Sequence, residues 1–405
     1  MQKKGNSSAW IKVSIMASTL FTPGNIGPIT LRNRTIRSAA FEGMCPDGIP
    51  SDSLISYHRA VAAGGIGMTT VAYVSVTNGG RTFPHQAWMR PEAMPFFKKL
   101  TDAVHREGAL ASVQLGHGGN MGDRKVSGER AVAPSAKMNL FGLNLPRAMT
   151  ESDIDRVVKS HGEAVRMARD AGFDAVEIHA GHGYLISQFL SPYTNRRNDQ
   201  FGGSLANRAR FLTMIMKEVR RAAGRDMAVL VKTNMEDGFK KGMQMSEGLE
   251  VARILEGEGA DALVLSGGFV SKSSFFMMKG KTPHQELIKR QSDILIKTGM
   301  FFFSRIVVRD YPYKEAYFLD DALKFREAVK IPLVYVGGLV SKNKIEEVLM
   351  KGFDFVAIAR ALVAEPDFVN RIRDDGSHVS KCLRCGPCNL CVATMYNGEA
   401  ECIFE

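Results

Sequence analysis

The sequence predicts an α/β protein built on a closed (β/α)8 barrel, a TIM barrel, as a single domain with a short Cys-rich C-terminal tail. Eight short apolar runs recur along the chain, and longer segments with helical periodicity separate them. This alternation is expected of strands and helices around a parallel sheet. The length of 405 residues also falls within the range that such barrels reach as one unit.

The elements follow one another in a regular order. The eight predicted strands are RTIRSAA, GMTTVAYVSV, ALASVQL, DAVEIHA, MAVLVKTN, DALVLSGG, PLVYVGG and FDFVAIAR. Residues 152–172 repeat apolar positions at three- and four-residue spacing, which predicts a helix of the outer ring. Residues 269–316 fit no strand–helix step and are rich in aromatic residues and Met. We therefore expect them to form an excursion over the mouth of the barrel.

Composition limits the partners and the compartment. The net charge of +11 comes from 53 basic and 42 acidic residues that are spread along the chain, so we expect no nucleic-acid partner. No apolar run is long enough to span a membrane, and none is expected to bind one. Five of the six cysteines lie from residue 382 onward, unlike the distribution in a secreted disulfide framework. This pattern indicates a reducing compartment, the cytoplasm.

The barrel is expected to span residues 18–375. The first 17 residues carry three Lys and no acidic residue, and they show no sustained periodicity. We expect them to be a disordered extension that can be removed without loss of the fold. Residues 376–405 form the predicted Cys-rich tail.

Polar residues at the ends of the predicted strands mark the expected site, because active sites of such barrels lie at the carboxyl ends of the strands. The third strand ends near Gln114, the fourth near His179, the fifth near Lys232 and the eighth at Arg360. The seventh strand ends in Gly337 and Gly338, followed by a predicted helix. Glycines before a helix let backbone N–H groups approach an anion closely and bind it. Together with Arg360, this pair of glycines predicts a phosphate site between the seventh and eighth strands.

The stretch HAGHGY, residues 179–184, allows three interpretations. His179 and His182 on one helical face could ligate zinc, but Gly181 and Gly183 disfavour a helix and no third ligand is near. The two histidines could instead have only a structural role at a strand end. In the interpretation that we favour, both donate hydrogen bonds to a substrate oxygen while Tyr184 supplies a proton.

The tail carries a separate motif. Cys385, Cys388, Cys391 and Cys402 have C-x2-C-x2-C-x10-C spacing, which is typical of iron–sulfur or zinc sites. Cys382 extends the run and could replace one ligand. We expect a metal centre here, with free thiols as the alternative.

These residues carry a family resemblance. EIHAGHGYLISQFLSPYTNRRNDQFGGSLANRARF resembles the signature of the Old yellow enzyme family of flavin-dependent ene-reductases. LRNRTIRSAAFEG, SVQLGHGG, PLVYVGGLVS and FVAIARALVAEPDF match in the same order, so the resemblance covers roughly residues 19–375. The tail is similar to that of the 2,4-dienoyl-CoA reductase branch, which makes a [4Fe-4S] cluster the leading expectation over zinc. In that branch further FAD- and NAD-binding domains usually follow.

The resemblance implies FMN at the barrel mouth and NADH or NADPH as co-substrate. The implied FMN-binding residues are Ala40, Gln114, Lys232, Gly337, Gly338, Ala359 and Arg360. In the implied reaction, hydride passes from the nicotinamide through flavin N5 to an electron-poor alkene. His179 and His182 polarise the carbonyl of this alkene, and Tyr184 protonates its α-carbon. The expected partners are therefore a small alkene and a nicotinamide nucleotide, and a homo-oligomer is allowed.

Two positions depart from the family pattern, and other functions stay open. Lys232 stands where most relatives have an arginine, so the bidentate fork of a guanidinium is lost. Phe41 replaces a Thr or Cys, which removes a polar contact with the flavin. The alternatives are a flavin oxidase, demethylase or quinone reductase on the same scaffold. Less favoured are an aldolase with Lys232 as Schiff-base lysine and a non-catalytic metal-binding module.

Overall fold

The computed structural model describes residues 19–139, 144–290, 294–383, 389–395 and 398–402. The predicted N-terminal extension and two of the predicted metal ligands, Cys385 and Cys388, lie outside the described residues.

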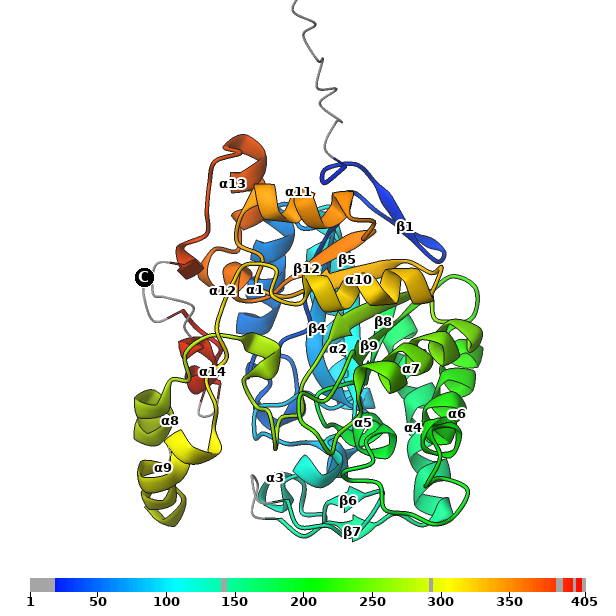
Figure 1. Cartoon of the computed structure of the whole chain (residues 1–405). Helices are drawn as coiled ribbons and strands as arrows, with labels where there is room; N and C mark the ends of the chain where they lie inside the picture. Colours follow the sequence, from blue (N-terminus) through cyan, green and yellow to red (C-terminus); the bar gives the residue numbers. More distant parts are fainter. Residues whose placement is uncertain (1–18, 140–143, 291–293, 384–388, 396–397, 403–405) are drawn as a thin grey trace, which may run out of the picture.

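Eight parallel strands close into a barrel, which confirms the predicted fold class (Figure 1). Each strand lies on one of the eight predicted runs, and neighbours in the barrel follow chain order until the last strand pairs with the first. The barrel strands are β3 (Thr35–Arg37), β4 (Met68–Ser75), β5 (Leu110–Gly116), β8 (Ala175–Ala180), β9 (Ala228–Asn234), β10 (Ala262–Ser266), β11 (Leu333–Val336) and β12 (Phe355–Ile358). Two short pairs lie outside it: β1 (Gly24–Ile26) with β2 (Ile29–Leu31), and β6 (Val132–Ala133) with β7 (Arg147–Ala148).

Helices cover the outside of the barrel (Figure 1). The helix predicted over residues 152–172 is α4 (Glu151–Asp170). It begins with a capping box, in which the Asp153 N–H donates to the Thr150 side chain and the Thr150 N–H donates to the Asp153 carboxylate. The other outer helices are α1 (Asp52–Ala63), α2 (Met94–Arg106), α6 (Leu205–Ala223), α7 (Met245–Gly257), α10 (Leu319–Ala328), α11 (Lys342–Met350) and α13 (Phe368–Asp374).

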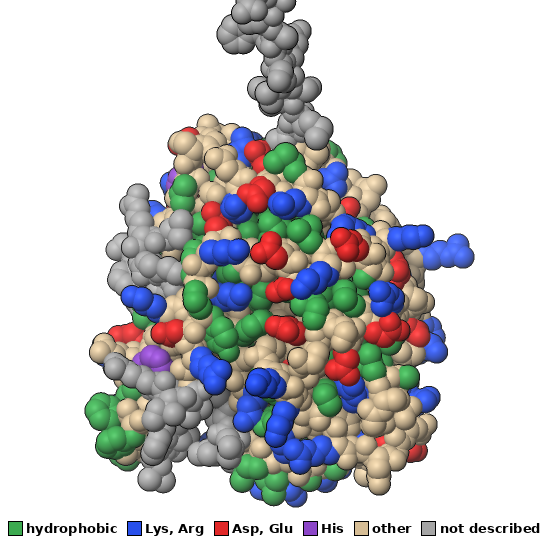
Figure 2. All heavy atoms as spheres, in the orientation of Figure 1, with side chains coloured by type: hydrophobic (Ala, Val, Ile, Leu, Met, Phe, Trp, Pro, Cys, Tyr) green, Lys and Arg blue, Asp and Glu red, His purple; other side chains and the backbone are tan. Residues whose placement is uncertain are grey.

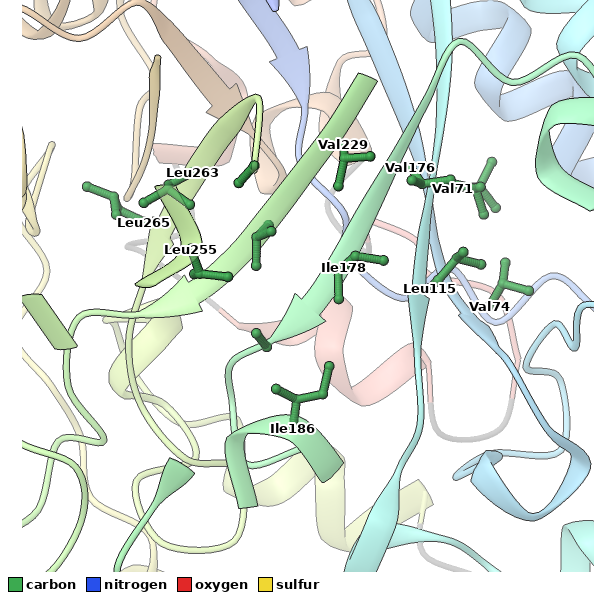
Figure 3. Packing of buried hydrophobic residues seen from close by; sticks show 14 of the residues in the cluster. Val71, Val74, Leu115, Val176, Ile178, Ile186, Val229, Leu255, Leu263 and Leu265 are labelled. Atoms are coloured by element: carbon green, nitrogen blue, oxygen red, sulfur yellow. The ribbon is translucent and has the colours of Figure 1, made fainter. Parts of the chain in front are cut away.

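Side chains alternate along the strands between the helix layer and the barrel interior. Val176 and Ile178 of β8 belong to the apolar core between strands and helices (Figure 3). Glu177 and His179 therefore lie on the opposite, inner side of β8. His179 is paired in register with Lys232 of β9, so these polar side chains are directed into the barrel mouth by strand alternation alone.

The segment 269–316 and the tail lie on one side of the barrel. The segment contains the helices α8 (His284–Arg290) and α9 (Ile294–Val307), and in the tail α14 (Leu390–Thr394) contacts α8 (Figure 1). The Asn389 amide donates to the Lys281 carbonyl across this contact, at 3.2 Å. In the described part of the chain, no helix has the length and apolar character needed to cross a membrane.

Candidate active site

A cavity of about 1350 Å³ lies at the carboxyl ends of the strands. Single-ligand pockets usually measure roughly 300–1,000 Å³, so this cavity has room for a cofactor and a substrate together. The excursion supplies part of its wall, including Phe275, Met277 and Tyr313, which confirms the position predicted for that segment. The predicted site residues that line it are Ala40, Gln114, His179, His182, Tyr184, Lys232, Gly338, Ala359 and Arg360.

The two histidines lie against each other at the end of β8. Their ring centroids are 5.1 Å apart and the rings are nearly perpendicular. His182 has a φ of +60°, a strained backbone conformation that is held by a hydrogen bond from its N–H to Asn234 Oδ1 at 3.0 Å. Its Nε2 lies 2.7 Å from Ser266 Oγ, which orients the ring. His179 Nδ1 is buried and has no hydrogen-bond partner in the described structure.

Both imidazoles are neutral over the physiological pH range. Burial, and next the positive charge of Lys232, lowers the pKa of His182 to about 3. Burial lowers the pKa of His179 well below its ordinary value, and the neighbouring His182 and Lys232 act in the same direction. Each ring therefore has one N–H to donate and one nitrogen that accepts.

Tyr184 packs its ring against His179, with centroids 4.6 Å apart, and lies just before α5 (Leu185–Leu190). Sequence reasoning missed its second aromatic neighbour, Tyr73, whose ring centroid lies 4.8 Å away. Burial, and next the neighbouring Tyr184, raises the pKa of Tyr73 well above its ordinary value. The Tyr73 hydroxyl lies 3.0 Å from Thr82 Oγ1, so this second phenol is already engaged by the protein.

Sequence reasoning also missed a buried carboxylate beneath these rings. Glu177 Oε1 lies 3.0 Å from Lys232 Nζ and accepts a hydrogen bond of 2.6 Å from the Gln114 amide. Lys232 Nζ donates as well to the Ala39 carbonyl at 3.1 Å. Burial lowers the pKa of Lys232, while Glu177 opposes this shift. The signal in the sequence is the alternation of Glu177 with the apolar residues of its run, which places it on the same side as His179.

The predicted phosphate site lies where β11 and β12 end. Gly338 has a φ of +72°, and its carbonyl accepts from the Tyr313 hydroxyl at 2.9 Å. Arg360 donates to Asn389 Oδ1 at 2.9 Å and begins α12 (Arg360–Ala364). Gly337 does not line the cavity, and its carbonyl accepts from the Tyr335 hydroxyl at 3.2 Å.

A carboxylate occupies part of this anion site. Glu315 Oε1 accepts from the N–H groups of Val340 and Ser341, at 2.9 and 2.8 Å, just before α11. Sequence reasoning missed Glu315 because it lies in the excursion, far from the seventh strand in the chain. These two N–H groups are therefore already engaged. A phosphate at this site would bind instead to the backbone near Gly338 and to the Arg360 guanidinium.

A family model for the NADH:flavin oxidoreductase / NADH oxidase family matches residues 19–274. The chain belongs to this family. It is therefore a flavin oxidoreductase, with FMN and NAD(P)H as the cofactor and co-substrate that the family supports. The resemblance to the Old yellow enzyme family is confirmed.

Relatives of this flavin oxidoreductase have different named activities. The chain is 40% identical over 381 residues to a 4,4'-dithiodibutanoate disulfide reductase of Rhodococcus erythropolis, covering 94% of both chains. It is 31% identical to a metal reductase of Desulforamulus reducens, covering 92% of this chain but 51% of that protein, so it spans about half of that relative.

Solved structures of the family share the fold. A 2-naphthoyl-CoA reductase matches with a TM-score of 0.76 at 25% identity, covering 88% of this chain and 52% of that one. Morphinone reductase matches with a TM-score of 0.70 at 24% identity, covering 91% and 92% of the two chains.

The residues of this flavin oxidoreductase fit FMN. Arg360 and the Gly338 backbone supply the cation and the close approach that a phosphate needs. Gln114 gives its N–H to Glu177, so its amide oxygen remains to accept, while Lys232 supplies a positive charge. Phe41 and Phe83 stack at 4.8 Å and both line the cavity, where the sequence predicted only the loss of a polar contact at Phe41.

The tail contributes thiols to the same cavity. Cys382 and Cys391 line it, whereas Cys402 does not. Within the described ranges, no group of three His, Cys, Asp or Glu side chains could hold a metal ion. Cys385 and Cys388 lie outside those ranges, so the predicted four-cysteine set is not described as a whole.

Proposed function

We propose that this enzyme transfers hydride from NADH or NADPH through FMN to an electron-poor alkene, such as an α,β-unsaturated carbonyl compound. One observation carries the proposal. Two neutral imidazoles and the Tyr184 phenol meet at one wall of the cavity, beside residues that suit FMN. Bound FMN would supply the hydride chemistry, which no side chain can provide.

The side chains have separate tasks in this proposal. His179 and His182 donate hydrogen bonds to the carbonyl oxygen of the alkene, which makes its β-carbon electrophilic. Both rings stay neutral across the physiological pH range, so each keeps one N–H and this donation does not change with pH. Tyr184 gives its proton to the α-carbon and regains one from solvent. The residues proposed to bind the cofactor are Ala40, Gln114, Lys232, Gly338, Ala359 and Arg360. Gly337 precedes Gly338 and does not line the cavity.

The visible spectrum of the purified protein tests this proposal. We expect flavin absorbance that is released into the supernatant by acid precipitation, and that is bleached anaerobically by NADH or NADPH. Addition of 2-cyclohexenone should restore the absorbance and yield cyclohexanone in equal amount. A colourless protein, or one that no nicotinamide nucleotide bleaches after reconstitution with FMN, would contradict the proposal.

Disulfide reduction is the second candidate, favoured by the 40% identity to a disulfide reductase over nearly the full length of both chains. The reaction consumes two electrons and two protons and yields two thiols. Re-oxidation of the reduced protein by 4,4'-dithiodibutanoate, with two thiols released per NAD(P)H consumed, would favour it. Fast re-oxidation by enones together with slow re-oxidation by this disulfide would favour alkene reduction.

The remaining alternatives are separated by simple observations. An oxidase or demethylase would be re-oxidised fastest by oxygen, and a quinone reductase by quinones. An aldolase would be trapped by borohydride with a carbonyl substrate. Lys232, however, forms an ion pair with Glu177, and the chain belongs to a flavin family, so this alternative is no longer needed to explain Lys232.

We also propose that the tail, residues 376–405, binds a metal through Cys385, Cys388, Cys391 and Cys402, as a [4Fe-4S] cluster or zinc. The spacing of these cysteines supports this proposal. In this proposal, residues 18–375 form the FMN-binding barrel. The cysteines of the tail suit a reducing compartment such as the cytoplasm.

A further inference from the structure

The cavity wall carries more positive charge than the proposed cofactor uses. Seven Lys or Arg side chains line the cavity, whereas Asp123 is the one acidic residue among the described lining residues. Arg37 and Lys232 are neutralised from behind by Glu42 and Glu177, at 2.6 and 3.0 Å. Arg290 lies 3.8 Å from a Glu286 carboxylate oxygen, and Arg360 is the residue proposed to bind the phosphate of FMN.

The unused charge is concentrated on one short element. Arg124 and Lys125 belong to α3 (Arg124–Ser127), and Arg130 follows it closely in the chain. Figure 2 shows Lys and Arg side chains gathered over the lower middle of this face, in the region where Figure 1 places α3. The Asp123 carboxylate caps α3 by accepting from the Lys125 N–H at 2.8 Å, and it forms no ion pair with these side chains in the described structure.

These side chains remain able to bind a ligand. Arg124 and Lys125 are exposed at the rim, and neither forms an ion pair with any residue that the structure describes. Arg130 Nη2 donates to the Leu145 carbonyl at 3.3 Å, and a guanidinium has further N–H groups to donate. Arginine side chains bind carboxylates and phosphates through paired hydrogen bonds, and a positive rim speeds the arrival of anions.

We propose that Arg124, Lys125 and Arg130 form a second anion site at the cavity rim. It binds a carboxylate or phosphate group carried by the molecules that exchange electrons in the cavity. The source of this group is either the oxidising substrate or the 2'-phosphate of NADPH. The inference rests on the proposed function, because it assumes that both molecules enter this cavity.

The test compares two pairs of partners, and the members of each pair differ in one anionic group. In the Arg124→Gln/Lys125→Gln variant, reduction by NADPH and by NADH is followed by stopped flow, and re-oxidation by 4-oxo-2-pentenoate is compared with its methyl ester. We expect the half-saturating concentration of NADPH or of 4-oxo-2-pentenoate to rise about 10-fold, and that of the counterpart without the tested group, NADH or the methyl ester, to stay within about 2-fold. The control is Arg59→Gln/Arg106→Gln, which removes the same charge from exposed residues of α1 and α2 that do not line the cavity.

The outcomes separate the two sources. An effect confined to NADPH assigns the site to the coenzyme phosphate, and an effect confined to 4-oxo-2-pentenoate assigns it to the substrate carboxylate. Added salt should weaken the binding of the same anionic partner to the wild-type protein. Equal changes for the two members of each pair, or no change for either member, would overturn the inference. The wild-type half-reactions run alongside report separately on the proposed function.

Discussion

Glu177 and Lys232 form an ion pair at 3.0 Å, and both side chains are only 2% exposed. The pair joins the neighbouring strands β8 and β9 beneath the two histidines. The stability of the barrel should therefore depend on the charges of Glu177 and Lys232. A charge buried in this way is costly unless its partner is present.

Glu177→Gln should therefore destabilise the flavin-free protein by about 3 kcal/mol, because it leaves the Lys232 ammonium buried without its counter-charge. Urea unfolding measures the change. Glu177→Gln/Lys232→Met removes both charges and should recover part of the loss. Glu250→Gln breaks an exposed ion pair with Arg253 and should cost at most about 1 kcal/mol. If the single and double variants were equally destabilised, the pair would not have the role assigned to it.

The strands and the residues at their ends could be predicted from the sequence, because short apolar runs and strand alternation are local properties. The inward position of Glu177 could have been predicted in the same way, since it alternates with apolar residues in its run. Glu315 and Tyr73 were not, because their roles depend on contacts between segments that are distant in the chain. The contribution of Cys382 and Cys391 to the cavity wall likewise arises from the packing of the tail on the barrel.

Ligand binding by the histidine pair should be independent of pH between about 5 and 8. The pKa of His182 is lowered to about 3 and that of His179 lies well below its ordinary value, so both rings keep one N–H throughout this window. Titration of the oxidised protein with 2-cyclohexenone, a carbonyl ligand that does not ionise in this range, measures the affinity through the change in flavin absorbance. His179→Ala should weaken binding at every pH. A loss of affinity in the wild type with a midpoint near pH 6.5 would show that an imidazole titrates there.

Stability should fall as the pH is lowered below 6.5, and His161 of α4 contributes to this fall. Burial lowers its pKa to about 4, so between pH 6.5 and 4 the unfolded chain binds a proton that the folded protein does not. The free energy of unfolding should drop by about 1.4 kcal/mol per pH unit for this residue. His161→Leu should remove that part of the slope. Parallel stability curves for the variant and the wild type would contradict the assignment.

The proposed metal centre of the tail should depend on Cys391 and be independent of Cys45. Anaerobically purified protein should contain iron with acid-labile sulfide, or zinc, close to stoichiometric amounts. Cys391→Ser should lower the metal content, whereas Cys45→Ala, which removes a buried thiol of the barrel region, should not. A metal-free wild-type protein whose tail thiols all titrate freely would defeat the proposal.

The most direct test of the central claim is the re-oxidation step of Tyr184→Phe, measured by stopped flow after anaerobic reduction with NADPH. Reduction should proceed at nearly the wild-type rate, because it needs no proton from Tyr184. Re-oxidation by an enone should slow by roughly 10²–10⁴-fold, the loss typical of a missing general acid, while re-oxidation by a quinone should be spared. Tyr73→Phe is the matched control, because that hydroxyl is already engaged with Thr82, and it should leave the enone step within about 10-fold of the wild type. If Tyr184→Phe reduced enones at the wild-type rate, the assignment of Tyr184 as proton donor would be wrong.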